Sequence, residues 1–440
     1  MTSVQYRAIG FFIGKRGIVL QKYMLKSWKT QCLLAIVGVG VGVATGIVIA
    51  IFGNILLWIS AFRDTHIKIL LPFLAVFGLV LVAAYRKWGG RSNEGMGLVL
   101  SVGQRKEQDI PLRLIPFSIV STWLTHLFGG SAGREGVAVQ IGATVSHHIG
   151  KRFDIEDNRH IFLLTGMAAG FAALFQTPIA AIFFAMEILV VGKWAMHGIV
   201  PMITAALTAC FTGHMLGIKK FHATLTGDIP FTPHMILYLV LLGLLFGVVG
   251  KLFVFALRYI KKYTTKYMPN PYWRIFLGGM MISILIWVLH DGRYTGLGTN
   301  LIAAAFANET IYPYDWICKL VLTAFTLSIG FQGGEVTPSF AIGAALGVVL
   351  AKVFGLPVLP VAALGFVTVF GSATNTLFAP ILVGCELFGF VYLPYFMIVC
   401  LAMHLLCCMP SIYSQQQQYT YTKTIKEMIF KCKHRKDTAI

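Results

Sequence analysis

The sequence Gly133-Arg134-Glu135-Gly136-Val137 stands inside an apolar region and recurs in outline 200 residues later. It precedes Ile141-Gly142-Ala143. The later copy, Gly333-Gly334-Glu335-Val336-Thr337, precedes Ile342-Gly343-Ala344. Each copy places one carboxylate between a glycine turn, where backbone can approach another group closely, and an apolar segment. This pattern favours two related halves.

A second pair of acidic residues supports the same division of the chain. Phe175-Gln176-Thr177-Pro178-Ile179 leads to Glu187, and Phe378-Ala379-Pro380-Ile381 leads to Glu386, which is 199 residues further on. We expect Glu187 and Glu386 to end their helices and to bind backbone or basic groups. One internal duplication explains all of these coincidences; the alternative is chance similarity between glycine-rich membrane segments.

The composition excludes most soluble proteins. Of 440 residues, 57% are apolar and only 12% are charged, and the mean hydropathy is +0.76, whereas a soluble domain carries about 25% charged residues. A disordered chain needs low hydrophobicity, and a membrane β-barrel needs short alternating segments. Long apolar runs predict an all-α polytopic membrane protein.

The apolar runs predict how this protein is organised. A first membrane repeat spans 31–217 and a second spans 235–412, with a linker at 218–234, and basic segments at 1–30 and 413–440 flank the repeats. Several runs are short and broken by Gly and Pro, which is typical of broken, re-entrant helices around a transport site. We expect the repeats to be inverted, although the sequence itself shows only the duplication.

The charge distribution favours membrane topology over nucleic-acid binding. The chain has 36 Lys and Arg against 17 Asp and Glu, and basic residues gather at both ends, as is typical of cytoplasmic flanks. We expect an integral, multi-pass protein of the cell (inner) membrane with both termini in the cytoplasm. The eight Cys have no metal-binding spacing, so no metal and no cofactor are expected, and Gln415–Gln418 is interpreted as a solvated linker.

Glu135 is the first candidate for ion chemistry. The segment after it predicts a short helix whose free N–H groups and positive dipole end attract an anion. A carboxylate at this end occupies the anion position itself, and on protonation it becomes neutral and leaves, which couples anion to proton. The alternative is that Glu135 only caps the helix or pairs with Arg134.

Three further candidates are weaker when taken singly. Glu335 repeats the design before Pro338, which suits the first turn of a helix, and its alternative is simple capping. Gly95-Met96-Gly97 is a third glycine-flanked turn that opens a short apolar segment. Tyr413 follows the last apolar run and offers either a phenolic donor to an anion or an interfacial anchor.

Taken together, these motifs resemble the CLC family of chloride channels and proton-coupled anion antiporters. Residues 133–137 are similar to its GREGP motif, 333–338 to its GxFxP motif and 95–98 to its GSGIP motif, and Tyr413 lies where the family has its anion-coordinating tyrosine. The resemblance covers about residues 31–414 and implies the CLC fold, a homodimer with one pathway per subunit, and Glu135 and Glu335 as gating and proton-carrying residues. The anion-binding residues it implies are Gly95, Met96, Gly97, Gly136, Val137, Val336, Thr337 and Tyr413.

The departures from the family pattern point to one branch. Met96 replaces a serine, Val137 replaces a proline, and Glu335 and Thr337 replace apolar or small residues, while Ile188 stands where chloride antiporters carry an internal proton glutamate. This set is similar to the fluoride/proton antiporter branch. Fluoride is small, strongly hydrated and a strong hydrogen-bond acceptor, so protonated carboxylates and Thr337 are suitable partners for it.

The sequence therefore predicts a fluoride/proton antiporter that exports fluoride while protons enter. The runner-up is a chloride channel or chloride/proton antiporter with a variant selectivity filter. An integral-membrane enzyme is a remote alternative, because no HExxH, Walker A or GxSxG motif is present. The expected partners are fluoride or chloride ions, protons, the lipid bilayer and a second copy of the chain, with no nucleic acid.

Overall fold

The computed structural model describes residues 28–418, apart from 154–156, 197, 228–229 and 407–408. The basic segment 1–30 and the tail 413–440 lie almost wholly outside these residues. Within the described part, helices make up nearly all the regular structure, which confirms the all-α class.

The first series of elements runs from α3 to α10 and covers the first expected repeat. It opens on its longest helix, and its α-helices after that vary between 8 and 18 residues. The elements are α3 (Trp28–Leu70), η1 (Leu71–Phe73), α4 (Leu74–Ala84), the π turn η2 (Tyr85–Gly89), η3 (Gly90–Glu94), α5 (Met96–Gly103), α6 (Leu114–Leu127), α7 (Glu135–Gly150), α8 (Asn158–Phe175), α9 (Pro178–Glu187), β1 (Val190–Val191) and α10 (Ile199–Met215).

The second series repeats this order from α11 to α18. It again opens on a long helix and continues through a very short one before the glutamate turn. The elements are α11 (Pro233–Tyr267), α12 (Pro271–Val288), η4 (His290–Gly292), α13 (Thr299–Phe306), α14 (Asp315–Ile329), α15 (Val336–Phe354), α16 (Val358–Thr374), α17 (Phe378–Phe388), η5 (Phe390–Tyr392), α18 (Leu393–His404) and β2 (Gln417–Gln418).

The helices differ greatly in length. Among the described residues, four helical stretches are long and apolar enough to cross a bilayer: Trp28–Gly103, Pro233–Tyr267, Pro271–Val288 and Val336–Phe354. By contrast, α9 has 10 residues and α17 has 11, well below the roughly 20 that a full span needs. Helix ends inside the membrane need partners from the protein, water or an ion, so the short helices bring backbone groups that need such partners to the interior.

Glycine contacts hold equivalent helix pairs together in the two series. Gly142 of α7 faces the backbone of Gly166 on α8, and Gly343 of α15 faces the backbone of Gly365 on α16. A Cβ atom on any of these glycines would collide with backbone atoms of the neighbouring helix. The same close packing at corresponding positions is independent support for the duplication.

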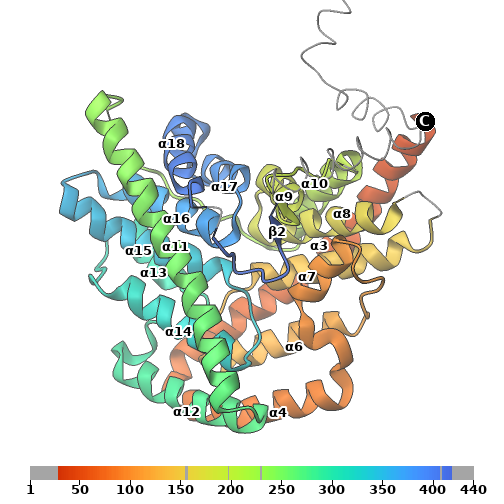
Figure 1. The fold of residues 1–440 in the computed structure, drawn as a ribbon, viewed down its shortest axis with the longest axis horizontal. Coiled ribbons are helices and arrows are strands. Elements are labelled where there is room, and N and C mark those ends of the chain that lie inside the picture. The colour runs from red at the N-terminus through yellow and green to blue at the C-terminus, as the bar shows by residue number, and fades with distance from the viewer. Residues whose placement is uncertain (1–27, 154–156, 197, 228–229, 407–408, 419–440) are drawn as a thin grey trace, which may run out of the picture.

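The two series meet along two helix pairs. In Figure 1, α4 packs beside α12 and α9 packs beside α17. At the contact between α9 and α17, Glu187 and Glu386 each bind the start of the opposite helix. The Glu187 carboxylate accepts hydrogen bonds from the N–H groups of Leu377, Phe378 and Ala379 at 3.0–3.2 Å. The Glu386 carboxylate accepts from Ile179 at 3.2 Å and Ala180 at 2.7 Å. Each glutamate therefore caps a helix of the other series, and the expected bonding to backbone is confirmed.

Candidate functional site

The starts of α7 and α15 meet head to head in the interior. The N–H of Gly133 donates to the carbonyl oxygen of Gly334 at 2.6 Å, and the N–H of Gly334 donates back to Gly133 at 2.8 Å. This antiparallel bridge needs very little space between the chains: a Cβ on Gly133 would lie 2.7 Å from the Pro338 ring and 2.9 Å from the Gly334 oxygen. The two glutamate turns therefore form one site.

Glu135 is buried in this site, with 1% of its surface exposed. Its carboxylate accepts a short hydrogen bond from the Thr337 hydroxyl and a longer one from the N–H of Arg134 at 3.3 Å. The Arg134 Nε atom lies 3.7 Å from Glu135 Oε1, a contact too long for a charge-assisted hydrogen bond. Glu135 therefore reaches across to the opposite series, which capping of α7 or pairing with Arg134 alone does not explain.

Glu335 occupies the N-cap position of α15 without capping it. Its side chain makes no hydrogen bond to the first turn of that helix, so the simple capping alternative is not observed. Glu335 Oε2 lies 3.6 Å from where a Cβ on Gly136 would stand. The second carboxylate therefore lies against the start of α7, just as Glu135 lies against the start of α15.

Backbone N–H groups surround the two carboxylates. The first helical hydrogen bond of α7 is donated by Ala138 and that of α15 by Ser339. The N–H groups of Gly136, Val137 and Val336 come before these bonds and belong to the unsatisfied first turn of each helix. Together with the dipoles of α7 and α15, they make the site attractive to a negative charge.

The third glycine turn lies alongside this site. Gly95 has a φ of +52°, which suits glycine and aims the start of α5 inward. A Cβ on Gly95 would stand 3.4 Å from the side-chain oxygen of Gln140 on α7, and one on Gly97 would stand 3.8 Å from Gln415. Met96 between them is 9% exposed. The start of α5 is thus packed between α7 and the segment after Tyr413.

Tyr413 is buried and not exposed as an interfacial anchor would be. Its side chain is buried, with 5% exposed, and its hydroxyl has no hydrogen-bond partner among the described residues. The hydroxyl lies within electrostatic range of Glu335 and Glu135. A buried hydroxyl without a partner is suited to donate to an anion.

Two buried lysines support the site, and sequence analysis missed both. Lys319 Nζ donates to Ser131 Oγ at 2.9 Å and to the carbonyl oxygen of Gly296 at 2.6 Å, so it holds the loop before Glu135. Lys251 Nζ donates to the carbonyl oxygens of Ser372 at 2.8 Å and Pro410 at 3.3 Å, near the segment that carries Tyr413. A search of the apolar runs for bases as well as acids would have found them.

The glutamine run is solvated at Gln415 and Gln417, as expected, but it is bonded to the helices and is more than a linker. Gln416 Nε2 donates to the carbonyl oxygens of Ile188 at 3.1 Å and Thr374 at 3.0 Å, and Gln417–Gln418 pairs in parallel with Val190–Val191. These bonds fix the segment after Tyr413 to both series of helices. Side-chain amides can satisfy carbonyl groups at helix ends, which explains the ordered run.

A polar cluster stands at the far end of α7, away from the site. Asp109 Oδ1 accepts hydrogen bonds from Lys151 and, at 2.9 Å, from His147 Nε2. Partial burial raises the pKa of Asp109, but the Lys151 ammonium and the His147 ring outweigh burial and lower that pKa to about 2. His148 binds the carbonyl oxygen of Ile110. Among the described residues, no group of three His, Cys, Asp or Glu is placed to hold a metal ion.

The fold defines an integral-membrane transport protein in which two helix starts, each with a carboxylate, meet in the interior. Comparison with known families gives the same class, because the voltage gated chloride channel family matches residues 77–407. The chain belongs to this CLC family of anion channels and transporters.

Individual relatives refine the comparison. A chloride/fluoride channel protein of Pseudomonas syringae pv. tomato is 33% identical over 365 residues, covering 81% of this chain and 80% of the relative. A crystal structure of a CLC-type fluoride/proton antiporter is 50% identical with a TM-score of 0.88, covering 90% of this chain and all of that one. A slow cyanobacterial Cl⁻/H⁺ antiporter shares the fold, with a TM-score of 0.75 at 20% identity over 85% of this chain and 94% of that one.

Proposed function

We propose that this protein is a fluoride/proton antiporter that exports fluoride in exchange for protons. The observation that carries the proposal is the hydrogen bond from Thr337 to Glu135, which brings a carboxylate of one repeat onto the helix start of the other. The half-identical relative described as a fluoride/proton antiporter supports fluoride as the substrate.

In this proposal the carboxylates carry protons and alternate with the anion. Glu135 in its charged form occupies the place between the helix starts, and once protonated it leaves that place to fluoride. Glu335 stands beside this place as a second proton acceptor. The anion is bound by the starts of α5, α7 and α15 and by Tyr413, that is, by Gly95, Met96, Gly97, Gly136, Val137, Val336, Thr337 and Tyr413.

Flux measurements on liposomes test the proposal. Purified protein should move fluoride in preference to chloride, and a fluoride gradient should drive protons in the opposite direction. Glu135→Gln should abolish proton movement, whereas Glu309→Gln, an exposed acid on the loop after α13, should leave it intact. Full proton coupling in Glu135→Gln would contradict the gating role.

Chloride transport is the second candidate. An H⁺/Cl⁻ exchange transporter of Yersinia pestis is 26% identical over 367 residues, covering 76% of this chain and 74% of the relative. The same liposome assay separates the candidates, since a preference for chloride would favour this one. An enzymatic role has no support from the family or from the site, and we propose a transporter that is not an enzyme.

We further propose an inverted-repeat homodimer in the cell membrane. In this proposal the repeats are 31–217 and 235–412, and the order of elements from α3 to α10 and from α11 to α18 supports them. With both termini in the cytoplasm, α3 would leave the cytoplasm and α11 would return to it at the basic residues Lys261 and Lys262. Exposed apolar side chains on α10 (Leu207, 51%; Phe211, 65%) suit either a second copy or lipid. Mass measurement in lipid nanodiscs tests the dimer, and labelling of single cysteines at the ends of α11 tests the orientation.

A further inference from the structure

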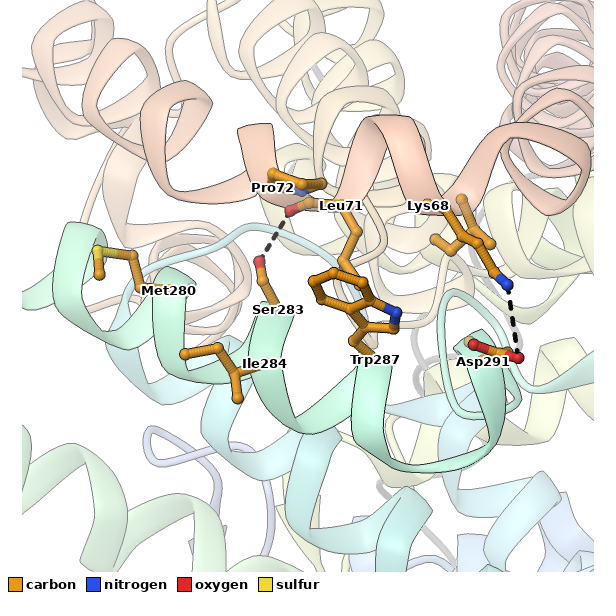
Figure 2. A pocket seen from close by; sticks show the side chains of 10 residues that line it. Lys68, Leu71, Pro72, Met280, Ser283, Ile284, Trp287 and Asp291 are labelled. Atoms are coloured by element: carbon orange, nitrogen blue, oxygen red, sulfur yellow. Dashed lines mark hydrogen bonds and ion pairs between the residues drawn. The ribbon is translucent and has the colours of Figure 1, made fainter.

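The structure has a groove on its outer surface, away from the two carboxylates. It lies between the end of α3 with η1 and the second half of α12, and its volume is about 210 Å³. Figure 2 shows Met280, Ile284 and Trp287 along the α12 side, with Lys68, Leu71 and Pro72 on the opposite side. The groove is therefore built from helices that belong to different repeats.

The polar end of the groove lies at the level of the lipid head groups in the membrane. Helix α12 has 18 residues, so it is about 27 Å long, close to the roughly 30 Å thickness of the bilayer core. Trp273 near its start and Trp287 near its end are 61% and 62% exposed, and exposed tryptophans gather at membrane–water interfaces. Trp287 and the polar end of the groove therefore lie at one interface.

The polar end of the groove carries two opposite charges that are only loosely paired. Lys68 Nζ lies 3.8 Å from Asp291 Oδ2, and both side chains are about two-thirds exposed. A charge-assisted hydrogen bond between them would be about 2.7–2.9 Å long. The ammonium retains donors for a phosphate, and the carboxylate retains acceptor sites for an amine.

The remainder of the groove is apolar. Met280 and Ile284 are 42% and 58% exposed, while the hydroxyl of Ser283 is already satisfied by the carbonyl oxygens of Leu71 at 2.8 Å and Gly279 at 2.9 Å. The wall thus offers an acyl chain apolar surface and no unsatisfied polar group.

We propose that this groove binds a zwitterionic phospholipid with a primary-amine head group, of the phosphatidylethanolamine class. Lys68 binds the phosphate, Asp291 accepts from the ammonium, and one acyl chain lies along Met280, Ile284 and Trp287. A choline head group has no N–H to donate to Asp291, and an anionic head group without an amine leaves that carboxylate unpaired. Charge complementarity therefore selects this class over other phospholipids.

The site has a structural link to the ion pathway. Leu71 and Ile67, which line the groove, face Gly129: a Cβ on Gly129 would stand 2.8 Å from Leu71 Cδ1 and 3.2 Å from Ile67 Cδ1. Gly129 begins the loop that leads to Glu135. A lipid in the groove therefore lies one layer of side chains away from the loop that carries the gating carboxylate.

Fluorescence quenching by lipids with brominated acyl chains tests the proposal on the intact protein. At equal mole fraction, brominated phosphatidylethanolamine should quench tryptophan more than brominated phosphatidylcholine or phosphatidylglycerol. Trp287→Phe should remove the excess quenching, whereas Trp273→Phe, at the other end of the same helix, should leave it. The three lipids share the phosphate that Lys68 binds and differ in the contact with Asp291, and one surface-type ion pair predicts roughly a two- to fivefold preference.

The head-group contacts are tested by a second variant. Lys68→Gln combined with Asp291→Asn should abolish the preference for the amine lipid while fluoride flux shows that the protein is still folded. The proposal would be overturned by equal quenching by all three lipids or by a preference for phosphatidylglycerol. It would also be overturned if Trp287 were not quenched because a second copy covers it. So would an amine preference that survives in the double variant.

Discussion

The hydrogen bond between Thr337 and Glu135 gives the sharpest prediction. Thr337→Val keeps the shape of the side chain and removes its hydroxyl. A hydrogen bond to a charged group contributes about 1.5–3 kcal/mol. Both residues are buried, but Glu135 retains its contacts with Arg134, so we expect a loss of about 2 kcal/mol. This corresponds to roughly a 30-fold lower occupancy of the central position by the carboxylate.

The expected consequence is a loss of coupling. When the carboxylate occupies the site less often, fluoride passes without exchanging places with it, so fewer protons move per fluoride. Simultaneous fluoride-electrode and pH recordings on liposomes measure this ratio. Thr337→Ser, which keeps the hydroxyl, should behave like the wild type.

A threonine elsewhere provides a matched control. The Thr165 hydroxyl is equally buried but donates within its own helix, to the carbonyl oxygen of Ile161 at 2.8 Å. Thr165→Val should leave the proton-to-fluoride ratio unchanged. If Thr337→Val moved as many protons per fluoride as Thr337→Ser, the reasoning from this hydrogen bond would be refuted.

Three further predictions concern stability, and thermal melting in detergent checks each of them. Gly142→Ala should destabilise the protein by about 1–3 kcal/mol, because the methyl group meets the backbone of α8, whereas Gly40→Ala, with nothing within 4 Å, should not; equal melting points would contradict the close packing. Glu187→Gln should lower the melting temperature more than Glu386→Gln, because Glu187 is the charged acceptor of three N–H groups and Glu386 of two. The reverse order would contradict this. The pKa of Asp109 is lowered from 3.8 to about 2. Its contribution to stability is therefore present above pH 3.8 and is lost as the pH falls through about 2. Asp109→Asn should accordingly melt below the wild type at pH 6 and match it near pH 2. A difference that persisted at pH 2 would count against the ion pair.

The residues that can be identified from the sequence are those whose chemistry is unusual for their apolar surroundings. Glu135 and Glu335 are noticeable because a carboxylate inside apolar sequence is costly, and their spacing revealed the duplication. The structure confirms the all-α fold and brings both residues together with Tyr413. The prediction of the fold class succeeded because long apolar runs are a local signal, whereas the roles of Glu135, Glu335 and Tyr413 stay predictions.

The failures concern partners that are distant in the chain. The carbonyl oxygen of Ile188 that Gln416 binds lies 228 positions away, so composition alone made the glutamine run resemble a linker. Lys319 was missed for a related reason. Its acceptors are the hydroxyl oxygen of Ser131 and the carbonyl oxygen of Gly296, and neither carries a charge. A lysine inside an apolar run can be found in the sequence, but its neutral acceptors cannot be identified there.

The exchanged caps of α9 and α17 limit how this transporter can move. A rocking motion of one half against the other, common among secondary transporters, would tear Glu187 and Glu386 from their amides and open the Gly133–Gly334 bridge. Breaking so many buried bonds in every cycle would be slow. The scaffold is thus suited to a transport cycle in which side chains move and the helices stay in place.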